Sequence, residues 1–335
     1  MPEEVSLSSM KNTPYRCPVC TSELVIEPGA GLKCSNAHLF KYADGTSVPV
    51  FASESNDVNE YTISNAAEIH DNALRWVFKT FSTSEEELRE NLLSRLQLKE
   101  GQKVLITGAG AGNDLPYLAK KVGKSGTIFA QDYAGEMLLS AVKRSKELYG
   151  LSDYDIEFSI SDATNLPFDE DLFDAVFHFG GLNLFSDIAA GISEMNRVVK
   201  DGGRVVFGDE GLAPWLKDTD YGRMIVNNNP LLNFSAPLEH IPTTARNLNL
   251  SWDPSYCFYI IDYTAVKNPL PLDIDVPHVG MRGGSIRTRY FGQLEGVDPD
   301  LKEALYTAAK RKGIDRVSFL EELLRSGLEN NKNDN

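Results

Sequence analysis

Glycine alternates with other residues at positions 108, 110 and 112, directly after the short apolar run Val104-Leu105-Ile106. Such a run is typical of a buried strand, and the apolar spacing between Leu115 and Val122 is typical of a helix packed on a sheet. Glycine lets the backbone turn sharply and lets a ligand approach it closely. A strand, a glycine turn and a helix N-terminus together predict a site for a nucleotide-type ligand.

An acidic residue, Asp132, ends a second apolar run at residues 126–131. It stands about 20 residues beyond the glycines, a spacing at which a carboxylate reaches the hydroxyl groups of a ribose. The dinucleotide fingerprint G-x-G-x-x-G requires a glycine at position 113, where the sequence has Asn113. The spacing therefore disfavours a nicotinamide oxidoreductase and favours another nucleoside cofactor.

A second group of chemically competent residues lies near the N-terminus. Cys17 and Cys20 form a C-x2-C pair, and Cys34 and His38 form a C-x3-H pair after a short spacer. Two close pairs of soft ligands suit tetrahedral Zn²⁺. The alternative is a set of free thiols beside a surface histidine, but three of the four cysteines of the chain gather here. We therefore predict a structural zinc site at these four residues.

Composition limits the possible functions. The chain has 335 residues, 42% of them apolar, and a formal net charge of -15. This length accommodates a full α/β domain with appendages, and the excess of acid opposes broad attraction to nucleic acid or to an anionic membrane. There is no apolar run of membrane-spanning length, and the acidic first residues differ from a signal peptide. These features predict a cytoplasmic protein without a membrane span.

Strand-like and helix-like patterns alternate regularly from residue 99 onward, which predicts an α/β protein with a doubly wound, mostly parallel sheet. The segment 285–291 reads as a strand and the two segments after it as amphipathic helices, so we expect an α+β C-terminal appendage. The predicted divisions are a flexible tail (1–15), a zinc ribbon (16–52), a linker with cleft-covering helices (53–98), a cofactor-binding core (99–267) and the appendage (268–335).

Five motifs in the core occur in order and at suitable spacing. They are the glycine turn 108–112, Asp132 followed by Met137-Leu138, Asp162-Ala163 followed by Leu166-Pro167-Phe168, the run 173–176, and the segment 194–203. Together they resemble the class I S-adenosylmethionine (SAM) methyltransferases of the ubiquinone/menaquinone C-methyltransferase type. The resemblance implies a Rossmann-like fold and SAM as cofactor.

The same resemblance implies roles for individual residues. The glycine turn would approach the methionine part of SAM, Asp132 would hold the ribose, Asp162 would accept from the adenine amino group, and the end of the fourth strand would line the sulfonium. The expected cofactor-contacting residues are Gly108, Ala109, Gly110, Asp114, Asp132, Tyr133, Asp162, Ala163, Phe179 and Gly180. The sequence departs from the family at Ile106, where an acid usually meets the SAM ammonium. Asp114 or a backbone carbonyl is the expected replacement.

The cysteine-rich segment 16–52 is similar to zinc ribbons that precede some methyltransferases. One example is the ribbon of bacterial 23S rRNA guanine-N1 methyltransferases, and another is the small zinc protein that activates tRNA and protein methyltransferases. His38 stands where all-cysteine ribbons have a cysteine. Imidazole is an equally suitable zinc ligand, so the metal prediction stands.

Methyl transfer from a sulfonium requires in-line alignment of the acceptor and exclusion of water. A base is needed only if the acceptor must lose a proton. His178 is the first candidate, with Glu210 and His240 next. A lone histidine inside an apolar strand is also a common core residue, and Asp209 and Glu210 could equally be a solvated strand end.

Three classes of function follow. We favour a SAM-dependent methyltransferase with a small-molecule or lipid-like acceptor. The ribbon suggests an rRNA or tRNA base methyltransferase instead, but the net charge of -15 counts against it, and only a basic surface around Arg282, Arg287 and Arg289 would support it. Ile106 leaves open a non-catalytic SAM-binding or regulatory protein, which a SAM titration would separate from the first two classes.

Overall fold

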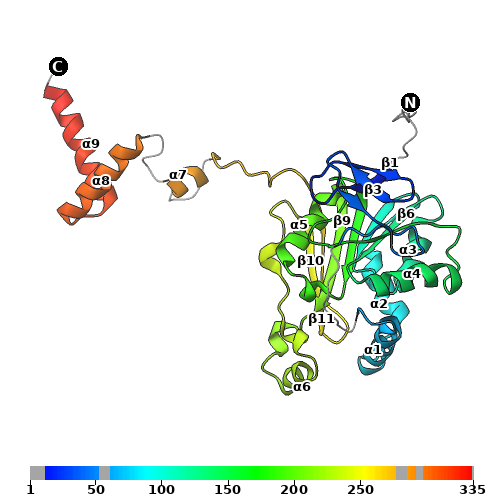
Figure 1. Ribbon diagram of the computed structural model, residues 1–335. Coiled ribbons are helices and arrows are strands. Elements are labelled where there is room, and N and C mark those ends of the chain that lie inside the picture. Colours follow the sequence, from blue (N-terminus) through cyan, green and yellow to red (C-terminus); the bar gives the residue numbers. More distant parts are fainter. Residues whose placement is uncertain (1–11, 53–60, 277–284, 292–296, 334–335) are drawn as a thin grey trace, which may run out of the picture. The chain divides into compact units, whose positions relative to one another are not determined.

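The chain divides into two compact units, Met1–Pro269 and Leu270–Asn335. Figure 1 shows the computed structural model, in which residues 12–52, 61–276, 285–291 and 297–333 are described.

The first unit is built on a seven-stranded sheet with the strand order β10-β11-β9-β8-β5-β6-β7. The five strands from β9 to β7 in this order run parallel, and β11 pairs antiparallel with both β9 and β10. This confirms the predicted doubly wound, mostly parallel sheet, which an antiparallel pair closes at one side. The strands are β5 (Lys103–Thr107), β6 (Thr127–Asp132), β7 (Asp155–Ile160), β8 (Phe173–Phe179), β9 (Val199–Glu210), β10 (Arg246–Trp252) and β11 (Phe258–Thr264).

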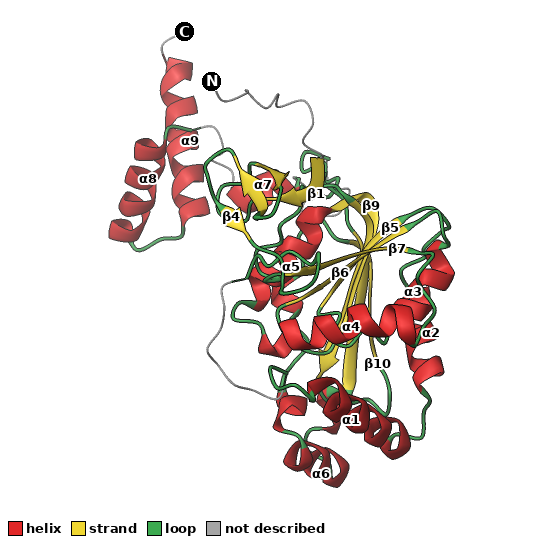
Figure 2. Ribbon diagram, turned by 45° about the vertical axis from the view of Figure 1, so that its right-hand side comes forward, coloured by secondary structure: helices red, strands yellow, loops and turns green. Residues whose placement is uncertain are grey.

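Helices cover both faces of this sheet (Figure 2). Apolar residues of α2, α3 and α4 share a core with one face, and those of α5 share a core with the other. Ser84 begins α2 as its N-cap and accepts a hydrogen bond from the Glu87 N–H at 3.1 Å. The helices are α1 (Ala66–Thr80), α2 (Glu85–Ser94), α3 (Leu115–Val122), α4 (Gly135–Glu147), α5 (Ile188–Val198) and α6 (Asp220–Asn228), with short 3₁₀ turns between α5 and β10.

The N-terminal segment forms a separate antiparallel sheet in the order β1-β2-β3-β4. We call this segment, residues 12–52, the ribbon; its strands are β1 (Asn12–Arg16), β2 (Glu23–Glu27), β3 (Gly31–Cys34) and β4 (Leu39–Phe40). The connection between β7 and β8, residues 161–172, contains no helix. Ribbon residues Tyr15, Leu24 and Leu32 share a core with Phe129 and Phe168. The ribbon thus covers a part of the sheet face that the helix-free connection between β7 and β8 leaves uncovered.

The second unit is helical in its described residues, with α7 (Ile286–Phe291), α8 (Pro299–Lys312) and α9 (Arg316–Asn333). The two long helices were predicted, but the predicted strand at 285–291, and with it the α+β character of the appendage, is wrong. A strand needs a partner for its backbone groups, and the described part of this unit offers none, whereas a helix satisfies them internally. The Arg287 N–H also bonds the Ile274 carbonyl at 2.9 Å, and its guanidinium pairs with Asp275 at 2.6 Å. Arg282 lies outside the described residues.

Among the described residues, no helix is long and apolar enough to cross a membrane.

Candidate functional site

The glycine turn joins the carboxyl end of β5 to α3 with three residues in left-handed conformation, Gly108, Gly110 and Gly112 at φ +65°, +53° and +82°. The Ala109 N–H bonds the carbonyl of Gln131 at 2.9 Å, which ties the turn to the neighbouring strand β6. A Cβ at position 112 would lie 2.9 Å from the Cβ of Ala141 on α4. Glycine is therefore required both for the bend and for close packing of the helix on the turn.

Asp132 ends β6 and points its carboxylate at the turn. One oxygen, Oδ2, accepts from the Gly110 N–H at 2.7 Å, and Oδ1 accepts from the Ala134 N–H at 2.8 Å. Burial raises the pKa of Asp132, and the backbone donors only partly offset this effect. A carboxylate can accept about four hydrogen bonds, so each oxygen keeps capacity for a ligand hydroxyl. Tyr133, beside it, is half exposed.

Open space adjoins the turn at the carboxyl end of β8. A Cβ built on Gly180 or on Gly181 would meet no described atom within 4 Å, and a Cβ on Gly108 would lie 3.9 Å from the Gly180 carbonyl oxygen. Phe179 precedes this bend, with its ring centroid 5.9 Å from that of Phe258. The turn after β5 and the bend after β8 therefore lie side by side at the carboxyl edge of the sheet, the edge where α/β folds bind ligands.

Asp162 and Ala163 follow β7 at the same edge. The Oδ1 of Asp162 accepts from the Thr164 N–H at 2.8 Å and from the Thr164 hydroxyl at 2.7 Å. These bonds hold the acid in its own turn, while Oδ2 has no hydrogen-bond partner among the described residues. Ala163 is buried. The arrangement leaves one carboxylate oxygen for an outside N–H donor.

The carboxylate of Asp114 already has a cationic partner in this structure. It lies at the start of α3 and pairs with the buried guanidinium of Arg89 from α2, which also pairs with Glu85 at 2.8 Å. Ile106, at the position that usually carries an acid, is buried in the core. Neither residue therefore offers a free carboxylate to the ammonium group of a bound SAM. The contribution of Arg89 was not predicted, because a single arginine on an amphipathic helix gives no signal of a partner 25 residues away.

His178 lies in the core directly beneath the glycine turn. Its Nδ1 is 2.9 Å from the carbonyl oxygen of Thr107, and its Cε1 would lie 3.0 Å from a Cβ on Gly108. Burial lowers the pKa of His178 to about 4, so the ring is neutral near pH 7. Its Nε2 has no partner among the described residues, and Phe185 packs edge-on at 5.0 Å.

His178 also belongs to a row of buried polar side chains that crosses four parallel strands. Ser159, Gln131, Thr107 and His178 are successive register partners on β7, β6, β5 and β8. All four are at most 1% exposed. A histidine held in such a layer supports the glycine turn above it. No described contact connects its ring to a position where a methyl acceptor could bind.

The other two candidate bases lie in different surroundings. Glu210 ends β9, half-buried, and its carbonyl accepts from the Asn183 side chain at 2.8 Å. His240 lies in a 3₁₀ turn, residues 238–240, that packs on α5, and its Nε2 lies 4.0 Å from a carboxylate oxygen of Glu239. The structure describes no contact that joins His240 to Glu210 or to His178.

Asp209 has a role that the sequence did not reveal. Its buried carboxylate accepts from the Gly181 N–H at 3.1 Å and from the Asn183 N–H at 2.5 Å. Burial, and next the neighbouring Glu210, raise the pKa of Asp209 well above its usual range. The side chain thus fixes the bend after β8. Its position at a strand end was the only sequence signal, and that signal does not distinguish a ligand contact from a loop support.

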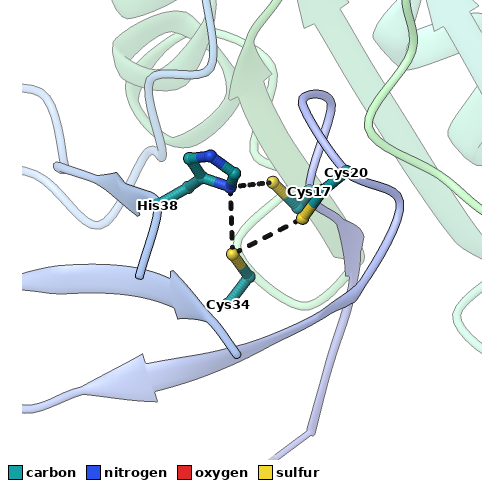
Figure 3. Close-up of side chains that lie close together, drawn as sticks. All are labelled: Cys17, Cys20, Cys34 and His38. Atoms are coloured by element: carbon teal, nitrogen blue, oxygen red, sulfur yellow. Dashed lines mark hydrogen bonds between the residues drawn. The ribbon is translucent and has the colours of Figure 1, made fainter. Parts of the chain in front are cut away.

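The four predicted metal ligands come together between the ribbon hairpins (Figure 3). The ligand atoms of Cys17, Cys20, Cys34 and His38 all lie within 4.8 Å of one another. The Sγ atoms of Cys20 and Cys34 are 3.7 Å apart, and His38 Nδ1 is 3.3 Å from the Sγ of Cys34. Two sulfurs at about 2.3 Å from a common tetrahedral centre would be roughly 3.8 Å apart, so the donor set and its size fit Zn²⁺.

The sheet topology and the glycine turn at its carboxyl edge define a Rossmann-like domain. Residues 82–210 match the ubiE/COQ5 methyltransferase family. The methyltransferase GfsG of Streptomyces halstedii is 31% identical over 231 residues, which cover 67% of this chain and 80% of that protein. The chain therefore belongs to the class I SAM-dependent methyltransferases.

Other relatives match a shorter region. The demethylmenaquinone methyltransferase of Bacillus subtilis is 38% identical over 118 residues, or 35% of this chain and 49% of that protein. The chain spans about half the length of the demethylmenaquinone methyltransferases that it matches. Among solved structures, a SAM-dependent methyltransferase of Aquifex aeolicus is 24% identical, with a TM-score of 0.40 over 53% of this chain and 89% of that one.

Proposed function

We propose that the protein transfers the methyl group of SAM to a small, lipid-like acceptor. The observation that carries the proposal is the bond between Gly110 N–H and the Asp132 carboxylate. It supports a site in which a carboxylate able to accept from ribose hydroxyls stands beside the glycine turn, at a residue with φ +53°. The menaquinone-precursor substrate named for the Bacillus subtilis relative supports a quinone-like acceptor.

Bound SAM would supply an activated methyl group on a cationic sulfur. Asp132 would accept from the ribose hydroxyls, and Asp162 Oδ2 would accept from the adenine amino group. Because the Asp114 carboxylate is already paired with Arg89, we propose that the methionine ammonium of SAM donates to backbone carbonyl oxygens of the glycine turn or of the Gly180 bend. The rest of the cofactor site would be lined by Ala109, Tyr133, Ala163 and Phe179.

We assign His178 a positioning role and leave base chemistry, if the acceptor needs it, to Glu210. His178 is buried and neutral, and it braces the Thr107 carbonyl next to the first glycine. Glu210 lies on the strand end beside the bend that Asp209 holds. His240 stays a weaker candidate, because nothing described connects it to this strand end.

We propose a structural Zn²⁺ at Cys17, Cys20, Cys34 and His38. The converging donors support it. Metal analysis of the purified protein should give one zinc per chain, and Cys34→Ser should lower this ratio. A ratio near zero in protein purified without chelator would contradict the proposal.

The proposed reaction can be tested by product analysis. The protein is incubated with isotopically labelled methyl-SAM and a reduced naphthoquinone that lacks the ring methyl, with an Asp132→Asn variant in parallel. Formation of S-adenosylhomocysteine together with a labelled naphthoquinol supports the proposal. Binding of SAM without transfer to this or to any other apolar phenolic acceptor would contradict the catalytic reading.

A further inference from the structure

The connection between β7 and β8 is held against the ribbon by three bonds. The Arg16 N–H donates to the Pro167 carbonyl at 2.8 Å, and the Arg16 guanidinium pairs with Asp169 at 2.6 Å. The side-chain amide of Asn165 donates to the Pro18 carbonyl at 3.1 Å. Pro18 lies between Cys17 and Cys20, inside the pair of metal ligands. One side chain therefore links the β7–β8 connection to the turn that carries two of the proposed metal ligands.

The same connection carries the acid proposed to bind adenine. The Asn165 N–H bonds the carbonyl of Asp162 at 3.1 Å, and Asp162 Oδ1 accepts twice from Thr164. Residues 162–165 thus form one tight turn, with Asp162 at its start and Asn165 at its end. A shift of Asn165 would be transmitted to Asp162 through a single turn.

The end of the ribbon supports the start of this turn as well. The Phe51 N–H bonds the Ile160 carbonyl at 2.7 Å, and the Ile160 N–H bonds the Pro49 carbonyl at 2.9 Å. These bonds extend the sheet beyond its outer strand β7 and cover an open edge. The aromatic rings of Tyr15 and Phe168 pack with centroids 5.4 Å apart. The ribbon therefore holds the connection from both of its ends.

We propose that Asn165 is a positioning residue that couples metal binding in the ribbon to cofactor binding at the carboxyl edge. This inference rests on the proposed function. With metal bound, the Cys17–Cys20 turn is fixed, and through Pro18 and Asn165 it fixes the orientation of Asp162. Binding energies coupled in this way are reciprocal, so the cofactor must also tighten the hold on the metal.

The expected change in cofactor affinity follows from the single hydrogen bond between Asn165 and the Pro18 carbonyl. A single hydrogen bond of this kind changes affinity by about threefold to tenfold. Asn165→Ala should therefore weaken binding of S-adenosylhomocysteine by about threefold to tenfold, while the zinc content stays at one per chain. Lys33→Ala is the matched control, because Lys33 is a partly exposed ribbon residue that pairs with Glu27 on the neighbouring ribbon strand, at 3.0 Å.

Two readouts without enzyme activity test the coupling. Calorimetry gives the affinity for S-adenosylhomocysteine, and a chromogenic chelator gives the rate of zinc release with and without that ligand. Saturating ligand should slow zinc release in the wild type and in Lys33→Ala by a similar factor, and this effect should shrink in Asn165→Ala. Equal slowing in all three proteins, or unchanged affinity in Asn165→Ala, would overturn the inference.

The same measurements distinguish a failure of the proposed coupling from a failure of the proposed function. A wild-type protein that binds no S-adenosylhomocysteine contradicts the proposed function itself. A wild-type protein that binds it, with zinc release indifferent to the ligand, contradicts only the coupling. If Asn165→Ala lowers the melting temperature strongly, Asn165→Asp serves as the second variant, since it keeps the size of the side chain but removes its donor.

Discussion

The position of His178 gives a prediction about pH that distinguishes a buried support from a catalytic base. The ring lies in the core and bonds the Thr107 carbonyl through Nδ1 at 2.9 Å. Two substitutions separate the hydrogen bond that His178 donates from the proton that its ring could take up. His178→Asn keeps an N–H donor on a smaller side chain, whereas His178→Phe keeps a ring and loses the donor. Neither variant can take up a proton at this position.

The magnitude follows from the shift in the pKa of His178, from 6.5 in the unfolded chain to about 4 in the folded protein. Between these values the unfolded chain binds a proton that the folded protein does not. The free energy of unfolding is therefore unaffected by this group above pH 6.5 and falls as the pH decreases from 6.5 to about 4. The total loss is about 3 kcal/mol.

Urea unfolding at pH values from 7.5 down to 4 measures this loss. The wild type should lose about 3 kcal/mol more than either variant over this range. His178→Phe should also be less stable than His178→Asn at pH 7.5, by about 1–3 kcal/mol, because it leaves the buried Thr107 carbonyl without its donor. Identical pH dependence in all three proteins would falsify the buried, neutral histidine. A limb in the pH–rate profile near 6.5 that disappears in both variants would restore His178 as a base.

Three further predictions concern the turn, the buried ion pair and the ribbon. Gly108→Ala should lower the free energy of unfolding by about 1–2 kcal/mol, because the residue has φ +65° and its Cβ would meet His178; equal urea midpoints would refute this. Arg89→Met should cost about 3–5 kcal/mol by leaving the Asp114 carboxylate buried without its partner, and a loss below about 1 kcal/mol would show that water reaches the acid. Cys34→Ser should lower the zinc content and the melting temperature together, whereas loss of zinc with an unchanged melting temperature would argue that the ribbon folds without metal.

Periodicity and glycine spacing were sufficient to predict the core of this fold. Each parallel strand is a short apolar run followed by a turn or a helix cap, and these signals are local. The gathering of Cys17, Cys20, Cys34 and His38 was predictable for the same reason. Spacing already indicated a ribose contact for Asp132, and the family resemblance then supplied the expected role of Asp162.

Long-range pairs were beyond the reach of the sequence. The bond between Asn165 and Pro18 joins residues 147 positions apart, and nothing in either segment indicates the other. The segment 285–291 has residues acceptable to both strand and helix, and the choice depended on whether a partner strand existed. Asp209 stands at a strand end where an acid can face a ligand or a loop, and only the fold shows that it holds the loop.

The most direct test of the account is a calorimetric titration of the protein with S-adenosylhomocysteine. We predict saturable binding at one site per chain, weakened at least about tenfold by Asp132→Asn, because the ribose would lose a charged acceptor. Asp153→Asn, a change of the same chemistry at an exposed acid paired with Lys124, should bind as the wild type does. Absence of binding, or equal affinity in the Asp132 variant, would contradict the claim that the turn and its acid hold the cofactor.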